Sequence, residues 1–403
     1  MALTPFRRFV AGQTASYLSY HMLGVIIGWQ VYDLTRSPMI LGFVGLMQFL
    51  PQFLLTLAAG HVADRHDRRR VTAACQITGA LLSAVLSLGS LAGLMDERCI
   101  LAAAFLVGAA RAFEYPTMQA LLPSLVNAGE LPRYLALSAG SRQAGVIVGP
   151  ALGGVLYIAG PGAAYAVCAC FSLLAALFIL SIRSDRPVFS REPASWRSVF
   201  EGLTYIRSKP EILGAISLDL FSVLLGGATA LLPVFARDIL DTGPWGLGLL
   251  RAAPATGAVA MSIYLARRPL KRRVGRTMFR AVAVFGLATM VFGLSRSFVL
   301  SLAALAVLGM SDMVSVVVRS SLIQLETPDD KRGRVSAVNA VFIGTSNQLG
   351  EFESGLTAAW FGVVPAVVLG GVGTLLVVIA WMRLFPALLR RETLTARRPP
   401  LNP

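Results

Sequence analysis

The hydrophobic positions of this chain form long runs that are separated by short polar stretches. A membrane-spanning helix needs about 20 mainly apolar residues, and the runs approach or exceed that length twelve times. We interpret each run as a helix that has lipid as its solvent. The predicted spans are residues 9–33, 38–62, 71–94, 98–126, 133–159, 161–182, 211–236, 243–266, 274–294, 297–325, 333–360 and 363–385.

The composition supports a membrane protein and argues against a nucleic-acid partner. Charged residues make up 14% of the chain, whereas a soluble domain carries about 25%. The net charge of +15 comes from arginines in short clusters between the apolar runs, which is typical of topology signals. No cleavable signal peptide is predicted, because the first residues lead into a long span without a small-residue cleavage site.

The distribution of basic residues predicts the orientation. Twelve spans place both termini on one side, and that side also receives most of the Lys and Arg residues, which indicates the cytoplasm. We therefore predict a multi-pass inner-membrane protein with both termini in the cytoplasm. The opposite side carries only Arg36, Arg98, Arg237 and Arg296.

The sequence repeats itself after 201 positions. Residues 133–154 align without a gap on residues 334–355, so that Arg133 meets Arg334 and Gly149 meets Gly350. The repeat predicts two halves of six helices each, a plan typical of transporters with a midplane site. The predicted domains are an N-terminal bundle (1–182), a cytoplasmic linker (183–210), a C-terminal bundle (211–386) and a cytoplasmic tail (387–403).

The linker should contain a helix that lies at the cytoplasmic membrane surface. Its apolar residues recur at helical spacing, and they are Trp196, Val199, Phe200, Leu203 and Ile206.

Ionisable residues within spans are costly and are therefore functional candidates. Arg111 and Glu114 share one face of the fourth span, and Asp312 and Arg319 share one face of the tenth. A self-contained salt bridge is the alternative role for Arg111 and Glu114, and a buried neutral imidazole is the alternative for His21. We assign no role to Arg251, Glu351 or Glu353. The candidates for a substrate or proton pathway are Tyr17, His21, Arg111, Glu114, Asp219, Asp312 and Arg319.

The loop between the second and third spans carries the pattern G-x-x-x-D-R-x-x-R-R. It resembles the loop signature of the major facilitator superfamily. Residues 29–45, WQVYDLTRSPMILGFVG, are similar to the first hairpin of the branch with the enterobactin and macrolide exporters. The matching loop residues are Gly60, Asp64, Arg65, Arg68 and Arg69.

The resemblance implies an all-α fold of twelve transmembrane helices in two pseudo-symmetric six-helix bundles. It implies that Asp64 faces the start of a helix in the other half, and that the loop latches the halves shut on the cytoplasmic side. Plain topology, in which the basic residues only hold the loop in the cytoplasm, is the alternative. Arginines of the loop could also bridge to acids such as Glu130 or to anionic lipid. In the superfamily, spans one, four, seven and ten line the central cavity, and these spans carry the charged candidates. Arg111 resembles the buried arginine of a fourth-span motif, although the Gln-Gly that follows it there is absent here.

The fifth span contains GVIVGPALGG, which resembles the antiporter signature of proton-driven exporters. Small residues four apart make a smooth face for helix packing, and packing without directional meaning is the alternative. The matching residues are Gly145, Gly149, Pro150, Gly153 and Gly154.

We therefore expect a proton-coupled exporter of a small amphipathic molecule such as a drug or a siderophore. It should be a monomer that uses no cofactor and no metal. The proton gradient should supply the energy for transport. An uptake carrier or a lipid flippase of the same fold is the alternative. A membrane enzyme is disfavoured because no metal cluster, catalytic triad or phosphate loop is visible. We interpret the four cysteines as small apolar side chains with a packing role only. They are Cys75, Cys99, Cys168 and Cys170.

Overall fold

The computed structural model of the chain describes residues 4–126, 128–182, 196–270 and 272–394. All regular elements in these ranges are helices, as the hydrophobic pattern predicts. The chain forms two compact units. Unit 1 contains residues 1–194 and 229–252, and unit 2 contains residues 195–228 and 253–403. Residues 229–252 therefore pack with the N-terminal half of the sequence, although they belong to the C-terminal repeat.

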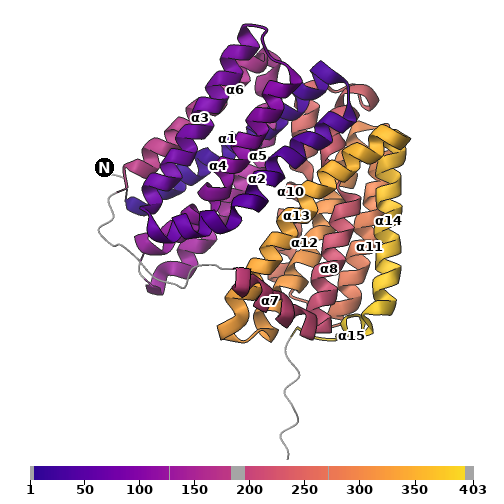
Figure 1. Ribbon diagram of the computed structural model, residues 1–403. Helices are drawn as coiled ribbons and strands as arrows, with labels where there is room; N and C mark the ends of the chain where they lie inside the picture. The colour runs from indigo at the N-terminus through magenta and orange to yellow at the C-terminus, as the bar shows by residue number, and fades with distance from the viewer. Residues whose placement is uncertain (1–3, 127, 183–195, 271, 395–403) are drawn as a thin grey trace, which may run out of the picture. The chain divides into compact units, whose positions relative to one another are not determined.

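Unit 1 is built from six long helices (Figure 1). Helix α1 packs against α5 and α6, α2 packs against α4, and α3 packs against α4 and α6. The bounds are α1 (Pro5–Thr35), α2 (Pro38–Arg65), α3 (Arg68–Leu91), α4 (Glu97–Leu121), α5 (Leu131–Leu156) and α6 (Pro161–Leu180).

Unit 2 repeats this kind of packing with helices of the second half. Helix α11 packs against α12 and α14, while α8 packs against α13 and α14 (Figure 1). The bounds are α7 (Trp196–Ser208), α8 (Pro210–Gly226), α11 (Val274–Leu294), α12 (Phe298–Glu326), α13 (Asp329–Phe361), α14 (Val363–Leu384) and α15 (Pro386–Leu389). Helix α10 (Gly243–Arg267) begins in unit 1 and ends in unit 2.

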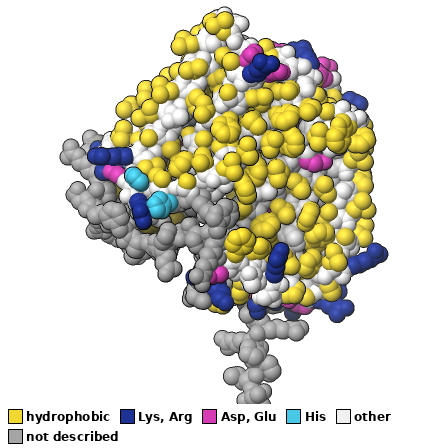
Figure 2. All heavy atoms as spheres, viewed as in Figure 1, with side chains coloured by type: hydrophobic (Ala, Val, Ile, Leu, Met, Phe, Trp, Pro, Cys, Tyr) yellow, Lys and Arg dark blue, Asp and Glu magenta, His cyan; other side chains and the backbone are white. Residues whose placement is uncertain are grey.

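The helices are suited to lipid by length and composition. Ten described helical stretches are long and apolar enough to cross a membrane. Helices α1 and α13 are longer still, but they interrupt their apolar residues with polar ones such as Gln13, His21, Glu351 and Glu353. Figure 2 shows hydrophobic side chains over most of the visible face.

The seventh predicted span is not one continuous helix. Helix α8 ends at Gly226, and the chain continues through a 3-10 turn (Ala228–Leu231), the short helix α9 (Leu232–Val234) and a π-helical turn (Phe235–Ile239). Consecutive glycines weaken a helix, and Pro233 removes a backbone donor. A proline also shortens the fourth predicted span. Helix α4 ends at Leu121, and a 3-10 turn that contains Pro123 follows it.

The linker helix predicted around residues 196–206 is α7. Ile206 is buried, Leu203 packs in the same apolar cluster, and Phe200 is exposed. The hydroxyl of Tyr205 donates to the carbonyl oxygen of Glu326 at 2.9 Å. One edge of α7 thus packs on α13 and the end of α12, while Phe200 faces outward. Residues 183–195, and the side chains of residues 196 and 199, lie outside the described part.

The small residues of the fifth span lie against α1. A methyl group added at Gly145 would lie 2.6 Å from Cβ of Tyr17, and one at Gly149 would lie 2.8 Å from Cβ of His21. At Gly153 the added group would lie 2.9 Å from the carbonyl oxygen of Met22. The two helices therefore approach too closely for any side chain at these positions.

Replacing Gly149 with Ala should destabilise the protein, because overpacking a tight contact costs about 1–3 kcal/mol. Gly140 is the matched control, since it lies on the same helix with open space around it. Gly140→Ala should leave the melting temperature unchanged or raise it, because Ala favours a helix by about 1 kcal/mol over Gly. Thermal unfolding of the purified variants measures both. Equal melting temperatures for the two variants would contradict the close approach of α1 and α5.

Candidate functional site

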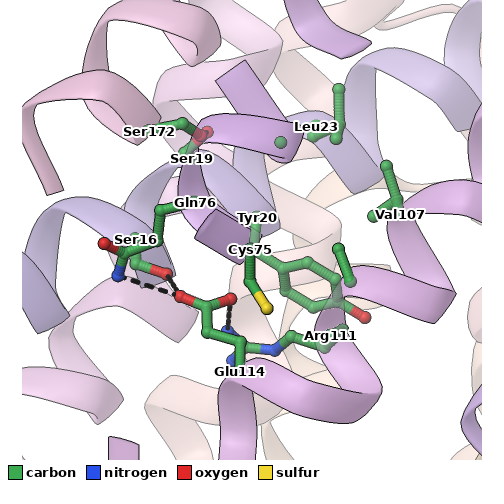
Figure 3. A pocket seen from close by; sticks show the side chains of 12 residues that line it. Ser16, Ser19, Tyr20, Leu23, Cys75, Gln76, Val107, Arg111, Glu114 and Ser172 are labelled. Atoms are coloured by element: carbon green, nitrogen blue, oxygen red, sulfur yellow. Dashed lines mark hydrogen bonds and ion pairs between the residues drawn. The ribbon is translucent and has the colours of Figure 1, made fainter. Parts of the chain in front are cut away.

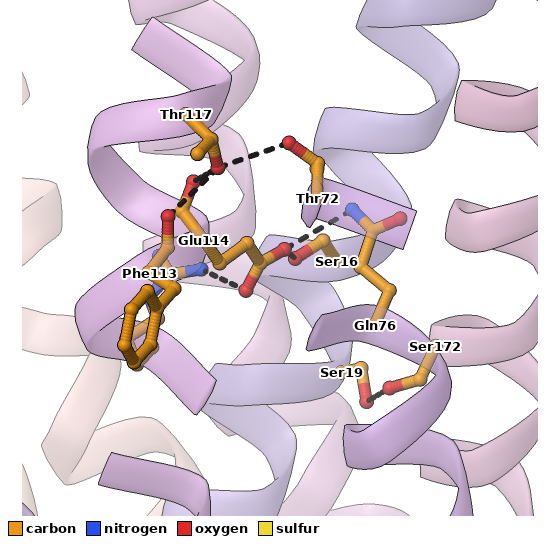
Figure 4. A network of polar contacts seen from close by, with 9 residues as sticks. Ser16, Ser19, Thr72, Gln76, Phe113, Glu114, Thr117 and Ser172 are labelled. Carbon is orange, nitrogen blue, oxygen red and sulfur yellow. Dashed lines mark hydrogen bonds and ion pairs between the residues drawn. The ribbon is translucent and has the colours of Figure 1, made fainter. Parts of the chain in front are cut away.

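A buried carboxylate organises the centre of unit 1. Glu114 on α4 is only 7% exposed. It accepts hydrogen bonds from Oγ of Ser16 at 2.5 Å and from Nε2 of Gln76 at 3.0 Å (Figure 4). It also pairs with Nη1 of Arg111 at 3.0 Å. These partners come from α1, α3 and α4, so one carboxylate joins three helices. A buried charge with this many donors is well compensated.

The guanidinium of Arg111 lies between two aromatic rings of α1. Its Cζ atom is 4.4 Å from the ring centre of Tyr17 and 4.6 Å from that of Tyr20. Such cation–π contacts are strongest where water is excluded, and the Arg111 side chain is only 11% exposed. The Tyr17 and Tyr20 rings also lie 6.1 Å and 5.2 Å from the ring of His21. The structure therefore brings together all four unit 1 candidates: Tyr17, His21, Arg111 and Glu114.

A small hollow adjoins this network (Figure 3). Its volume is about 40 Å³, and its lining includes Ser16, Ser19, Tyr20, Cys75 and Gln76. A drug-sized ligand needs about 300–1,000 Å³, whereas a water molecule needs about 10–15 Å³. The hollow therefore suits a few water molecules beside the carboxylate rather than a transported molecule.

Unit 2 contains a second buried ion pair. Asp219 on α8 pairs with the guanidinium of Arg319 on α12 and accepts a hydrogen bond from Oγ of Ser315 at 3.2 Å. The Asp219 and Arg319 side chains are 6% and 3% exposed. This pair joins two helices across the core of the unit.

Asp312 is not a member of that ion pair. It sits one helical turn before Ser315 and is partly exposed. Its carboxylate makes no ion pair or hydrogen bond with the described residues. Of the three predicted unit 2 candidates, Asp219 and Arg319 are thus joined, and Asp312 is not part of their ion pair.

The signature loop joins α2 to α3 and lies within unit 1. Arg68 donates to the carbonyl oxygens of Ala63 at 3.1 Å and of Ala120 at 3.0 Å, and thereby ties the ends of α2 and α4 together. Arg69 donates to the carbonyl oxygen of Ile182 at 2.6 Å. These two arginines complement the negative carboxyl ends of helices. Within the described chain, neither contacts Glu130.

The remaining loop residues have separate places. Gly60 lies inside α2, Arg65 ends that helix, and the side chain of Asp64 lies outside the described part. Partial burial disfavours the charged form of Asp67, but hydrogen bonds from the side chain and backbone N–H of Arg69 outweigh it. The pKa of Asp67 is therefore below its ordinary value. The latch expected at Asp64 stays a prediction.

The glycine-rich stretch of α5 that resembles the antiporter signature (residues 145–154) also lies against the start of α10. We call this stretch the α5 signature. A methyl group at Gly154 would collide with the carbonyl oxygen of Pro244, and one at Gly248 would lie 2.5 Å from the carbonyl oxygen of Pro150. The signature thus packs on α1 with one face and on α10 with the other. Arg251 on α10 also reaches α1, where its Nη1 donates to the carbonyl oxygen of Gly24 at 2.6 Å.

Sequence reasoning missed three members of the unit 1 network: Ser16, Tyr20 and Gln76. Ser16 and Tyr20 lie one residue before Tyr17 and His21 in the polar stripe, so the stripe could have included them. Gln76 was visible only as a lone amide in an apolar span. Of the unassigned acids, Glu353 accepts a hydrogen bond from Thr357 on the same helix at 2.7 Å.

Comparisons with known proteins agree with this architecture. The chain is similar to macrolide efflux protein A of Streptococcus pyogenes, with 23% identity over 92% of this chain and 93% of that protein. It is similar to the enterobactin exporter EntS of Citrobacter koseri, with 25% identity over 99% of this chain and 94% of that protein.

Solved transporters share the fold. A bacterial homologue of the human lysosomal transporter Spinster gives a TM-score of 0.73 at 13% identity, covering 96% of this chain and 98% of that one. A variant of the nucleoside transporter NupG gives 0.75 at 14% identity, covering 94% and 100%. The family description "Major Facilitator Superfamily" matches residues 9–351. The predicted fold class is confirmed, and this multi-pass membrane chain belongs to the major facilitator superfamily of transporters.

Proposed function

We propose that the protein is a proton-coupled exporter of a small amphipathic molecule in the inner membrane, working by alternating access. The observation that carries the proposal is Asp312, a partly exposed acidic residue within a spanning helix whose side chain makes no ion pair or hydrogen bond with the described residues. The names of two relatives, a macrolide efflux protein and an enterobactin exporter, support export as the direction.

Asp312 suits proton exchange better than the two paired acids do. Glu114 and Asp219 are each paired with an arginine, and the Asp219 side chain is 6% exposed. Removing one member of a buried pair leaves an uncompensated charge and costs about 3–5 kcal/mol. Asp312 forms no ion pair with the described residues, so a change of its charge leaves no buried counter-charge behind. Its protonation can therefore follow the access of water to the helix.

The proton gradient is a sufficient energy source. One charge that crosses a membrane potential gains about 2.3 kcal/mol per 100 mV. A tenfold concentration gradient of a neutral molecule requires only about 1.4 kcal/mol. One proton per cycle thus supports export against a gradient of more than tenfold, with no cofactor.

The change Asp312→Asn keeps the size of the side chain but removes its titration. We expect proton-driven export to fall by at least about tenfold, since the energy of the proton can no longer be used. The measurement is accumulation of macrolides, enterobactin and other amphipathic compounds in efflux-deficient cells, with and without a protonophore. Asp241→Asn, an exposed acid before α10, is the control and should export normally.

Two outcomes would contradict this proposal. Export that persists in Asp312→Asn would remove the residue from the coupling step. Accumulation that rises when the protein is present would favour the uptake carrier over the exporter, and indifference to the protonophore would favour a flippase or another energy source.

The change Asp219→Asn should act on stability rather than on coupling. It leaves the Arg319 charge buried without its counter-charge, so we expect a loss of about 3–5 kcal/mol and a lower melting temperature. The double variant Asp219→Leu/Arg319→Met should recover much of the loss, because apolar replacement of a whole buried pair is often neutral. Thermal unfolding of the purified variants tests this, with Asp312→Asn as the control. A single variant as stable as the native protein would show that the pair contributes little.

A further inference from the structure

We propose that unit 1 binds an anionic phospholipid in a groove between the start of α1 and the end of α6. One acyl chain lies on the apolar side chains of α6, and the headgroup phosphate meets the guanidinium groups of Arg7 and Arg8. The inference does not depend on the proposed export or on proton coupling. We call this groove the lipid groove, and its lining residues are Arg8, Leu174, Leu177, Phe178 and Ser181.

The dimensions of the lipid groove suit one acyl chain. Its α6 residues follow one another at intervals of three and four positions, so they share one face of the helix. From Leu174 to Ser181 this face extends about 10 Å, at about 1.5 Å per residue. That length fits within one leaflet, because the whole hydrocarbon core is about 30 Å thick. The groove has a volume of about 320 Å³, at the lower end of the range for small-molecule sites.

The α6 wall of the groove is suited to lipid rather than to water. The Leu174 and Leu177 residues are 46% and 56% exposed, and the adjacent Leu173 and Leu180 are exposed as well. In a chain that spans the membrane, such large apolar side chains are in contact with acyl chains. Any phospholipid can supply an acyl chain, so the charges at the polar end of the groove decide which headgroup is preferred.

Arg8 forms that polar end. Its Nη1 donates to the carbonyl oxygen of Ser181, directly after α6, and this hydrogen bond fixes the guanidinium beside the groove. An arginine has several N–H donors, and no other acceptor in the described chain takes one from Arg8. The side chain of Arg7 is exposed and makes no ion pair or hydrogen bond with the described residues. Both guanidinium groups can therefore bind a phosphate.

The start of α1 adds to the positive potential at this place. Oγ1 of Thr4 accepts a hydrogen bond from the N–H of Arg7 at 3.4 Å, and the first turn contains no acidic residue. The N-terminal end of a helix carries a partial positive charge, which favours anions and disfavours bases. Two arginines in this turn are thus electrostatically unfavourable until an anion joins them. Helix α4 differs, because its first turn has the acidic Glu97 beside Arg98.

These charges select an anionic headgroup over a zwitterionic one. A guanidinium can hold two phosphate oxygens with parallel hydrogen bonds. In phosphatidylcholine the choline cation cancels the phosphate charge, whereas phosphatidylglycerol keeps it. Each basic residue near an anionic lipid surface strengthens binding by about fivefold. With two arginines, the groove should prefer phosphatidylglycerol by about tenfold or more.

The test measures which lipid lies beside the groove. The full chain is placed in phosphatidylcholine nanodiscs after its four native cysteines are replaced, and Leu173→Cys carries a bimane fluorophore that brominated acyl chains quench. Brominated phosphatidylglycerol should half-quench this reporter at a mole fraction about tenfold or more below that of brominated phosphatidylcholine. Arg8→Gln should reduce this ratio about fivefold, and Arg8→Lys, which keeps the charge, should reduce it less. If Arg8→Gln does not fold, Arg7→Gln should still lower the ratio.

Two controls separate a site from a general effect of charge. Arg98→Gln removes a first-turn arginine from α4 and should leave the ratio unchanged. A reporter at Leu106→Cys, an exposed position on α4, should show no preference between the two lipids.

Four outcomes would overturn the proposal. They are equal quenching by both lipids in the native chain, an unchanged ratio in both Arg7→Gln and Arg8→Gln, and a fall in Arg98→Gln as large as in Arg8→Gln. The fourth is loss of the preference when inorganic phosphate is added at constant ionic strength, which would indicate a site for a free anion instead. The quenching needs neither a transported compound nor a proton gradient, so a failure of the export proposal leaves this readout intact.

Discussion

Charges within lipid must find their partners inside the protein, and this constraint shapes both units. In unit 1, three helices each send at least one donor to Glu114, and two aromatic rings flank Arg111. In unit 2, Arg319 and Ser315 hold Asp219. These groups specify how neighbouring helices are aligned, because a shift of one helix would leave a charge without compensation. Against this background Asp312, whose carboxylate makes no ion pair or hydrogen bond with the described residues, differs from the two paired acids.

Close helix packing also shapes the fold. The glycines of the α5 signature allow α1 to approach on one side and the start of α10 on the other. Helix α5 therefore lies between a helix of its own half and a segment of the other half of the sequence. A signature that resembles one of exporters thus has a concrete structural role, because it packs on α1 and on the start of α10.

The sequence predicted the helices well because lipid imposes a simple rule on length and polarity. Most span limits agree within a few residues, since prolines and capping residues such as Pro38 and Asp67 begin the helices. The break at Gly227 was missed, because apolar residues continue through it and hydropathy does not report backbone geometry. The same limit applies to partners: the spacing joined Arg111 to Glu114, but it could not show that Ser16 and Gln76 complete the site from other helices.

Position in the chain also concealed the ion pairs that Arg36 forms with Asp238 and Arg237 forms with Asp33. Arg36 and Arg237 were interpreted only as a minority of basic residues on the outer side, because their acidic partners lie about 200 residues away in the sequence. Pairing across the repeat depends on how α1 meets residues 229–252, and no local pattern encodes that. The family signature loop shows the reverse case. Its residues were recognised from the sequence, yet the described contacts of Arg68 and Arg69 lie within unit 1.

The central claim is that movement of substrate is tied to movement of protons in the opposite direction. The most direct measurement uses purified protein in liposomes with a pH-sensitive dye inside and no proton gradient at the start. A gradient of an exported compound, once the cell assays have identified one, is then imposed. Our account predicts that protons move against the flow of the compound and that the internal pH shifts accordingly. Flow of the compound without a pH change, or with protons moving in the same direction, would contradict it.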